Sequence, residues 1–244
     1  MKVYLFLMFV IVSFLAAQPE QLCFVSMIND NEDIFIIHED GTGMTQLTKS
    51  PDNEWSPRWS PDGTKIAFIS SKKVVEEEEN SEICVMNADG TGLKNISNSE
   101  ANEWDPRWTK DGRIVFISDR NRYWELFIIN SDGSSLQSLI DNWVPDEHMC
   151  WSPDGTKIAE ESDATGNWEI YVGDAERIQM TNITNSPADD LDPCWNEDGS
   201  KIAFVSNRDG DQEIFIIHPD GKGIIQLTKN KCDDHTPQWR PRKK

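Results

Sequence analysis

The sequence predicts an all-β protein, a five-bladed β-propeller with four antiparallel strands in each blade. A tryptophan recurs with spacings of 49, 43, 44 and 44 residues, at Trp59, Trp108, Trp151, Trp195 and Trp239. Four of these tryptophans open similar phrases, of which residues 59–68 (WSPDGTKIAF) are the fullest example. Asp-Gly pairs separate short runs of β-branched and aromatic residues within each repeat. Four short strands in about 44 residues is the period typical of a propeller blade.

The strands of one repeat follow one another in a fixed order. The first expected strand runs through a Pro-x-Trp sequence, and an Asp-Gly turn joins it to the second, an Ile-Ala-Phe-like run. A loop leads to the third strand, residues 213–218 in the last full repeat, and Asp220-Gly221 turns the chain into the fourth, residues 224–228. Asp-Gly suits both turns because hairpin turns need residues that accept a positive φ at little steric cost.

The two ends of the repeat region are complementary. Residues 22–26 read as a second strand with no tryptophan strand before them, and residues 236–240 read as a first strand. We therefore expect the N- and C-terminal strands to complete one blade and close the ring, which removes an exposed sheet edge. The predicted domain is 18–244, with repeats at approximately 21–65, 66–113, 114–157, 158–201 and 202–244.

The N-terminus reads as a secretory signal peptide over residues 1–17. Lys2 precedes an apolar run from residue 3 to residue 15, and Ala16-Ala17 end it. The run is shorter than the roughly 20 apolar residues of a membrane-spanning helix, and no later stretch approaches that length. A buried N-terminal strand or helix is the alternative. The signal peptide predicts a periplasmic or secreted, soluble product.

The formal net charge of −20 limits the partners. An acidic surface repels nucleic acid and anionic lipid, so neither is expected to bind. It suits basic protein surfaces, cationic ligands and divalent metals, although acidity also serves solubility alone. The five cysteines lack metal-binding spacing, and Cys150 and Cys194 occupy the same position in successive repeats. We expect their side chains to point the same way around the ring and predict no disulfide framework.

An acidic residue stands five positions before each repeated tryptophan: Glu54, Glu103, Asp146, Asp190 and Asp234. Rotational repetition predicts that these five carboxylates form a ring near one mouth of the central channel. Oxygen ligands of this kind suit Ca²⁺, and their charge suits a basic partner segment. The alternative is that each carboxylate caps a local turn by accepting backbone N–H groups.

A second set of acidic residues, here called the second acidic register, stands at the start of the expected third strands: Asp33, Glu82, Glu125, Glu169 and Glu213. We interpret it as structural, because these residues lie next to large apolar ones. Arg120 and Arg208, five residues upstream, are expected to pair with Glu125 and Glu213.

The tryptophans fall into two groups. Trp59, Trp108, Trp151, Trp195 and Trp239 are predicted to be structural core residues that wedge neighbouring blades together, since one side chain buries roughly 150–250 Å². A carbohydrate-binding platform is the alternative. The remaining five are candidates for aromatic side chains that face a partner: Trp55, Trp104, Trp124, Trp143 and Trp168.

These phrases resemble the TolB-type, WD-like propeller repeat. The resemblance rests on residues 57–68 (PRWSPDGTKIAF) and on residues 206–215 (SNRDGDQEIF), and it covers almost all of the chain after residue 17. It implies a propeller fold and, by similarity to TolB, a partner-binding role in the cell envelope.

No motif of a known catalytic class occurs. The sequence lacks a Gly-x-Ser-x-Gly elbow, a phosphate loop, a His-Glu-x-x-His zinc motif and a dinucleotide fingerprint. We therefore predict a non-enzymatic, monomeric scaffold that binds a protein or peptide. The alternative is a carbohydrate lyase or hydrolase with a carboxylate or metal site at the axis, near His148 and His235.

Overall fold

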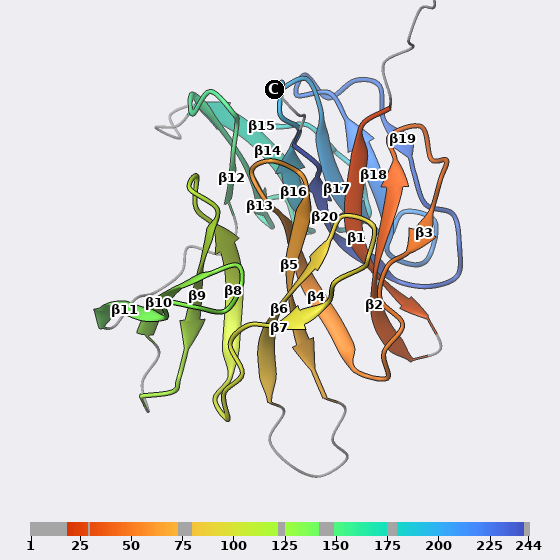
Figure 1. Ribbon diagram of the computed structural model, residues 1–244. Helices are drawn as coiled ribbons and strands as arrows, with labels where there is room; N and C mark the ends of the chain where they lie inside the picture. The colour runs from red at the N-terminus through yellow and green to blue at the C-terminus, as the bar shows by residue number, and fades with distance from the viewer. Residues whose placement is uncertain are drawn as a thin grey trace, which may run out of the picture.

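The computed structural model describes residues 19–28, 30–72, 80–121, 125–141, 149–174 and 180–241. It shows five four-stranded antiparallel sheets (Figure 1), which confirms the predicted fold class. The predicted signal peptide, residues 1–17, lies outside the described residues. Within the described ranges, no helix is long and apolar enough to cross a membrane.

The blades follow the order of the chain. The first contains β1 (Gln21–Ile28), β2 (Asn31–His38), β3 (Thr45–Gln46) and β20 (Asp234–Trp239). The second contains β4 (Asn53–Trp59), β5 (Lys65–Ser71), β6 (Ser81–Asn87) and β7 (Lys94–Asn95). The third contains β8 (Glu103–Trp108), β9 (Arg113–Ser118), β10 (Glu125–Asn130) and β11 (Gln137–Asp141). The fourth contains β12 (Met149–Trp151), β13 (Lys157–Ser162), β14 (Glu169–Asp174) and β15 (Met180–Asn182). The fifth contains β16 (Asp190–Trp195), β17 (Ile202–Ser206), β18 (Glu213–Ile217) and β19 (Ile225–Gln226).

The first blade is assembled from segments at opposite ends of the chain. Strand β20 pairs antiparallel with β1, with Leu22 opposite Trp239 and Ser26 opposite Asp234. The backbone N–H of Arg240 extends this pairing by donating to the Gln21 carbonyl at 2.7 Å. These bonds satisfy the innermost edge of β1, which would otherwise be exposed.

The Asp-Gly turns form as predicted. Gly63 has a φ of 62°, a left-handed conformation that glycine adopts without strain. Asp62 accepts hydrogen bonds from the Thr64 backbone N–H at 3.0 Å and the Ser60 hydroxyl at 2.7 Å. These bonds hold the pKa of Asp62 down at about 2. The turn joins β4 to β5 and sets the register of the blade.

Apolar side chains fill the space between neighbouring blades. Four hydrophobic clusters join the first blade to the second, the second to the third, the fourth to the fifth and the fifth to the first. Fully buried phenylalanines of the second strands anchor them, at Phe24, Phe68, Phe116 and Phe204. Successive side chains of a strand point to opposite faces of its sheet, so each blade supplies side chains to both neighbouring blades.

The third and fourth blades differ, because no cluster of described residues joins them. Glu160 occupies the β13 position that phenylalanine occupies in the other four blades. Trp151 is 51% exposed, whereas Trp59, Trp195 and Trp239 are each 7% exposed and Trp108 is half-buried. The prediction that Trp151 is a core residue is therefore wrong, because no cluster of described apolar residues covers it.

Each innermost strand outside the fourth blade contains a β-bulge that the sequence analysis did not anticipate. The register of pairing shifts between Trp55 and Arg58, and equivalent shifts occur in the first, third and fifth blades. The bulged residue precedes a proline and has a φ of 49–52°, at Ser56, Asp105, Asp192 and Thr236. Proline is tolerated here because an innermost edge strand has N–H positions that need no partner. A bulge changes the direction in which the following side chains point. In these four strands the residue after the proline lines the axial cavity.

Candidate binding site at the propeller axis

The innermost strands enclose a cavity at the axis with a volume of about 460 Å³. All five contribute to its wall: β4, β8, β12, β16 and β20. Four of the repeated tryptophans form its aromatic surface, at Trp59, Trp108, Trp195 and Trp239, and prolines of the Pro-x-Trp sequences lie among them. A concave surface that combines aromatic and proline side chains with a small number of placed polar groups is typical of a ligand site.

The tryptophans also connect the blades. The indole N–H of Trp108 donates to the Arg58 carbonyl of the preceding blade at 2.9 Å. Trp239 makes the equivalent bond to the Cys194 carbonyl at 3.1 Å. These two bonds tie the second blade to the third and the fifth blade to the first, whereas the indole N–H groups of Trp59 and Trp195 have no partner among the described residues.

The positive charges of the cavity come from the residue between the proline and the tryptophan. Arg58 and Arg107 occupy this position in the second and third blades. The Asp105 carboxylate lies near both guanidinium groups. Its Oδ2 is 2.8 Å from Arg107 Nε, and its Oδ1 is 4.0 Å from Arg58 Nη2. One carboxylate against two guanidinium groups leaves donors free for a ligand, because each guanidinium carries five N–H groups.

The negative charges of the cavity lie on the fourth and fifth blades. Glu161 accepts a hydrogen bond from the Asp192 backbone N–H at 2.9 Å. Asp192 in turn accepts one from the Thr236 backbone N–H at 3.4 Å. These bonds cross from one blade to the next, so both carboxylates are fixed at the cavity wall.

Two cysteines also line the cavity, and their arrangement corrects the expectation from the sequence. Cys150 and Cys194 were expected to point the same way and not toward each other. The Trp195 backbone N–H, directly after Cys194, instead donates to Cys150 Sγ at 3.3 Å, so Cys150 faces the strand that carries Cys194. Equivalent positions need not be parallel here, because Met149 of β12 stands where β16 has Pro193.

The acidic register of the first strands is buried. Glu54, Glu103, Asp190 and Asp234 are at most 2% exposed, and Asp146 lies outside the described residues. Each of the four contacts groups near the end of its own blade, and the structure does not bring them together in an open ring. This burial corrects the expected placement at a channel mouth. No set of three or more His, Cys, Asp or Glu among the described residues is arranged to hold a metal, and Ca²⁺ binding stays a prediction.

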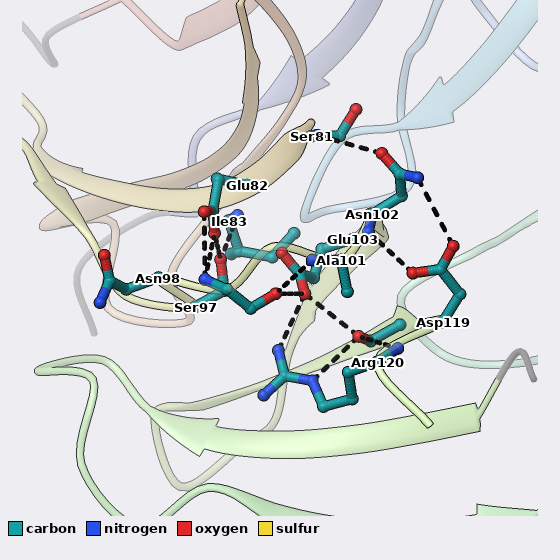
Figure 2. Close-up of polar contacts among 12 residues, drawn as sticks. Ser81, Glu82, Ile83, Ser97, Asn98, Ala101, Asn102, Glu103, Asp119 and Arg120 are labelled. Atoms are coloured by element: carbon teal, nitrogen blue, oxygen red, sulfur yellow. Dashed lines mark hydrogen bonds and ion pairs between the residues drawn. The ribbon is translucent and has the colours of Figure 1, made fainter. Parts of the chain in front are cut away.

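The buried carboxylates meet the second acidic register at the junctions between blades. Figure 2 shows this at the junction of the second and third blades, where Glu82 and Glu103 approach from different sheets. The Ser97 hydroxyl bonds Glu82, and the Ser99 backbone N–H donates to Glu82 at 3.1 Å. The Ser99 hydroxyl donates to Glu103 at 2.6 Å. One short loop therefore ties the third strand of one blade to the first strand of the next.

The same arrangement recurs around the ring. At the junction of the fifth and first blades, Asn230 donates its backbone N–H to Glu213 at 2.7 Å and its side-chain amide to Asp234 at 2.6 Å. At the junction of the first and second blades, the Ser50 hydroxyl bonds Glu54, which lies beside Asp33. The two registers are 21 residues apart in every repeat, a spacing that could have indicated their pairing.

The arginines near these junctions pair differently from the prediction. Arg120 donates to Glu103 at 2.8 Å, and Arg208 donates to Asp190 at 2.9 Å. The predicted pairs with Glu125 and Glu213 do not form, since each arginine follows a second strand and folds back toward the first strand beside it. Each guanidinium also stacks on aromatic rings, with Arg208 4.8 Å from the Phe215 ring centroid. This geometry supports a structural role for both arginines.

Burial raises the pKa values of the junction carboxyls. The pKa of Glu54 rises from 4.5 to about 7, mainly because the side chain is desolvated, and that of Glu213 rises to about 7 for the same reason. Desolvation also raises the pKa values of Glu103, Asp190 and Asp234. One oxygen of Glu54 accepts no hydrogen bond from the described residues, which agrees with a carboxyl that binds a proton easily.

These shifts predict a protein that is more stable at mildly acidic pH. A carboxyl whose pKa is higher in the folded state binds more protons there, so stability rises as pH falls from about 7 to about 4.5 and then levels off. We expect a gain on the order of 2 kcal/mol between pH 7.5 and pH 5 in the free energy of urea unfolding. Below about pH 4 the low-pKa turn carboxyls, such as Asp62, oppose this gain as they are protonated.

The matched variant is Glu54→Gln, which cannot ionise. We expect it to flatten the pH dependence of unfolding while remaining folded. Glu100→Gln, at an exposed residue, is the control and should leave the slope unchanged. A wild-type stability that does not change between pH 7.5 and pH 5 would contradict the assignment of raised pKa values.

Comparison with known proteins places the repeat in a family. A family model described as the TolB beta propeller domain matches residues 145–244. Residues 145–244 thus carry TolB-type propeller repeats. TolB from Acinetobacter baumannii has a similar structure, with a TM-score of 0.56 and 18% identity over 91% of this chain and 67% of that one. Kuenenia stuttgartiensis hydrazine synthase matches with a TM-score of 0.61 and 12% identity over 92% of this chain.

Two of the matched proteins are much longer than the segment that matches this chain. The chain covers 47% of the hydrazine synthase chain. Dipeptidyl-peptidase 5 from Porphyromonas gingivalis is 40% identical over 40 residues, which are 16% of this chain and 6% of that protein. At these identities the structural matches indicate the propeller fold, and the chemistry of the larger proteins is not transferred with it.

Proposed function

We propose that this chain is an exported, non-enzymatic TolB-type propeller that binds a segment of a partner protein in its axial cavity. The observation that carries the proposal is the convergence of four tryptophans and two arginines, from four different blades, on one cavity of about 460 Å³. Export to the periplasm or beyond is part of the proposal, which rests on the predicted signal peptide and on the similarity to TolB.

The chemistry of the cavity suits an extended peptide. Indole and proline surfaces pack well against proline and apolar side chains, and arginine donors match backbone carbonyls and carboxylates. Glu161 and Asp192 on the opposite wall offer acceptors for a basic side chain. Tryptophan and arginine are also the residues that most often dominate the energy of binding at protein interfaces. We therefore expect the partner segment to carry both a basic side chain and exposed acceptors.

Reversal of the cavity charge tests this function. The purified chain without residues 1–17 is immobilised, partners from an envelope extract are captured and cross-linked, and the linked peptides are sequenced by mass spectrometry. Synthetic peptides that match the linked segments are then titrated. We expect Arg58→Glu combined with Arg107→Glu to weaken binding at least about tenfold, the loss of one good charged contact.

Arg113→Glu is the matched control, because Arg113 is an exposed arginine that pairs with Asp111 on a turn of the third blade. It should leave binding unchanged. Equal affinity in the cavity variant and the wild type would place the binding site elsewhere.

A further inference from the structure

The two cysteines of the axial cavity form a close pair in neighbouring blades. Strands β12 and β16, which carry them, pack against each other. The Trp195 backbone N–H, directly after Cys194, donates to Cys150 Sγ at 3.3 Å. Cys150 Sγ is therefore held against the backbone that bears Cys194, and Cys150 packs against the clusters on both sides of the fifth blade.

The two sulfurs have different environments. Cys194 is buried, and its sulfur lies 3.8 Å from the Trp195 carbonyl oxygen and 3.6 Å from Gln238 Oε1. Cys150 is only half-buried and lines the cavity, where Arg58 and Arg107 also lie. Cys150 is thus the accessible sulfur, and Cys194 stands behind it as a protonated thiol.

The electrostatic surroundings favour a thiolate at Cys150. Hydrogen bonds from the Cys194 thiol and the Trp195 backbone N–H lower the pKa of Cys150 to about 7, and the two arginines act in the same direction. Two acidic groups, Glu161 and Asp192, line the same cavity on the fourth and fifth blades, which also carry the two cysteines, and each carboxylate accepts one backbone N–H. The other half-buried cysteine, Cys232, has a pKa raised by burial and by neighbouring carboxylates.

We propose that Cys150 and Cys194 are a redox-active thiol pair that reacts with small disulfides in the axial cavity. The Cys150 thiolate attacks one sulfur of the small disulfide, forms a mixed disulfide and expels a thiolate that takes up a proton. Cys194 then loses its proton to solvent and attacks Cys150 Sγ, which expels the second small thiol. One small disulfide is reduced to two thiols, and two protein thiols are oxidised to one disulfide.

The protein disulfide would join the fourth blade to the fifth at the axis. It would replace the thiol and the thiolate that face the cavity with an uncharged bond, so the oxidation state would change the site proposed for the partner. This inference needs only the cavity geometry, and it stands if the proposed partner binding fails.

The test exposes the folded chain at pH 7 to 2-hydroxyethyl disulfide, which is small and uncharged, and follows the products by intact mass and peptide mapping. We expect the wild type to lose two hydrogen atoms and to yield a cross-linked peptide that joins residues 150 and 194. We expect Cys194→Ser to stop at a stable mixed disulfide on Cys150. We expect Cys150→Ser to leave Cys194 unmodified.

Cys232 is the internal control in the same samples. Cys150 should react about tenfold faster than Cys232 at pH 7, because a larger thiolate fraction outweighs its lower intrinsic nucleophilicity. The rate at Cys150 should rise with pH to a plateau with a midpoint near 7. A mixed disulfide that persists on Cys150 in the wild type would overturn the pairing, and reaction at Cys232 alone would overturn the reactivity. Since both readouts come from the wild type, they hold even if a variant fails to fold.

Discussion

Replacement of Trp239 by alanine is expected to destabilise the protein by about 4 kcal/mol, whereas the same change at Trp151 should cost less than about 1 kcal/mol. The two tryptophans hold the same position in the repeat. They differ in that Trp239 is 7% exposed and Trp151 is 51% exposed.

The larger loss at Trp239 has two sources. Its indole is part of the cluster between the fifth and first blades, with Leu22 and Phe24, and its truncation leaves a cavity there. Its N–H also donates to the Cys194 carbonyl at 3.1 Å, and that buried acceptor would lose its partner. Since β20 is the innermost strand of the first blade, the loss should weaken the pairing of the two chain ends as well.

Urea unfolding of both variants, followed by far-ultraviolet circular dichroism, measures the difference in the free energy of unfolding. Near-ultraviolet dichroism of the folded baseline shows whether each variant keeps its tertiary packing. Equal losses at Trp239 and Trp151 would contradict the missing cluster between the third and fourth blades.

Replacement of Arg208 by leucine should cost about 3 kcal/mol, the second large effect. Asp190 is 0% exposed, and Arg208 donates to its two carboxylate oxygens at 2.9 and 3.2 Å. Leucine retains apolar contact with Phe204 and Phe215 but leaves a buried carboxylate without its cation. The loss of stability in Arg208→Leu therefore measures mainly the cost of the unpaired, buried Asp190 carboxylate.

The double variant Asp190→Asn with Arg208→Leu separates charge from packing. We expect it to recover at least half of the loss, because no buried charge remains. Arg113→Leu is the exposed control and should change stability by less than about 0.5 kcal/mol.

Acidification provides an independent readout of the same pair. Burial raises the pKa of Asp190 above its ordinary value even with Arg208 present, and removal of the arginine should raise it further. A group with a raised folded-state pKa adds stability as pH falls toward its unfolded pKa. Arg208→Leu should therefore gain more stability than the wild type between pH 7.5 and pH 5. An equal gain in both proteins would show that Asp190 is not the group left unpaired.

The repeated phrase alone determined the number of blades, the four strands of each and the Asp-Gly turns. These features depend on residues that are neighbours in the chain. An Asp-Gly pair such as Asp62-Gly63 favours a tight turn through its own two residues, and a continuous apolar run such as residues 202–205 makes a sheet with two apolar faces. The pairing of the end strands also followed, because a first strand at one end and a second strand at the other have one complementary arrangement.

The tertiary structure decided what lies between the blades. The burial of Glu54 beside Asp33, the return of Arg208 to Asp190, and the meeting of Cys150 with Cys194 all join segments that the repeat describes separately. The repeat shows which positions are equivalent, but it does not determine how the side chains at those positions are oriented toward the axis. Left-handed bulged residues such as Ser56 and Asp105 set that orientation. The exposure of Trp151 has the same origin, because burial depends on a neighbouring blade and not on the position of the residue within its own repeat.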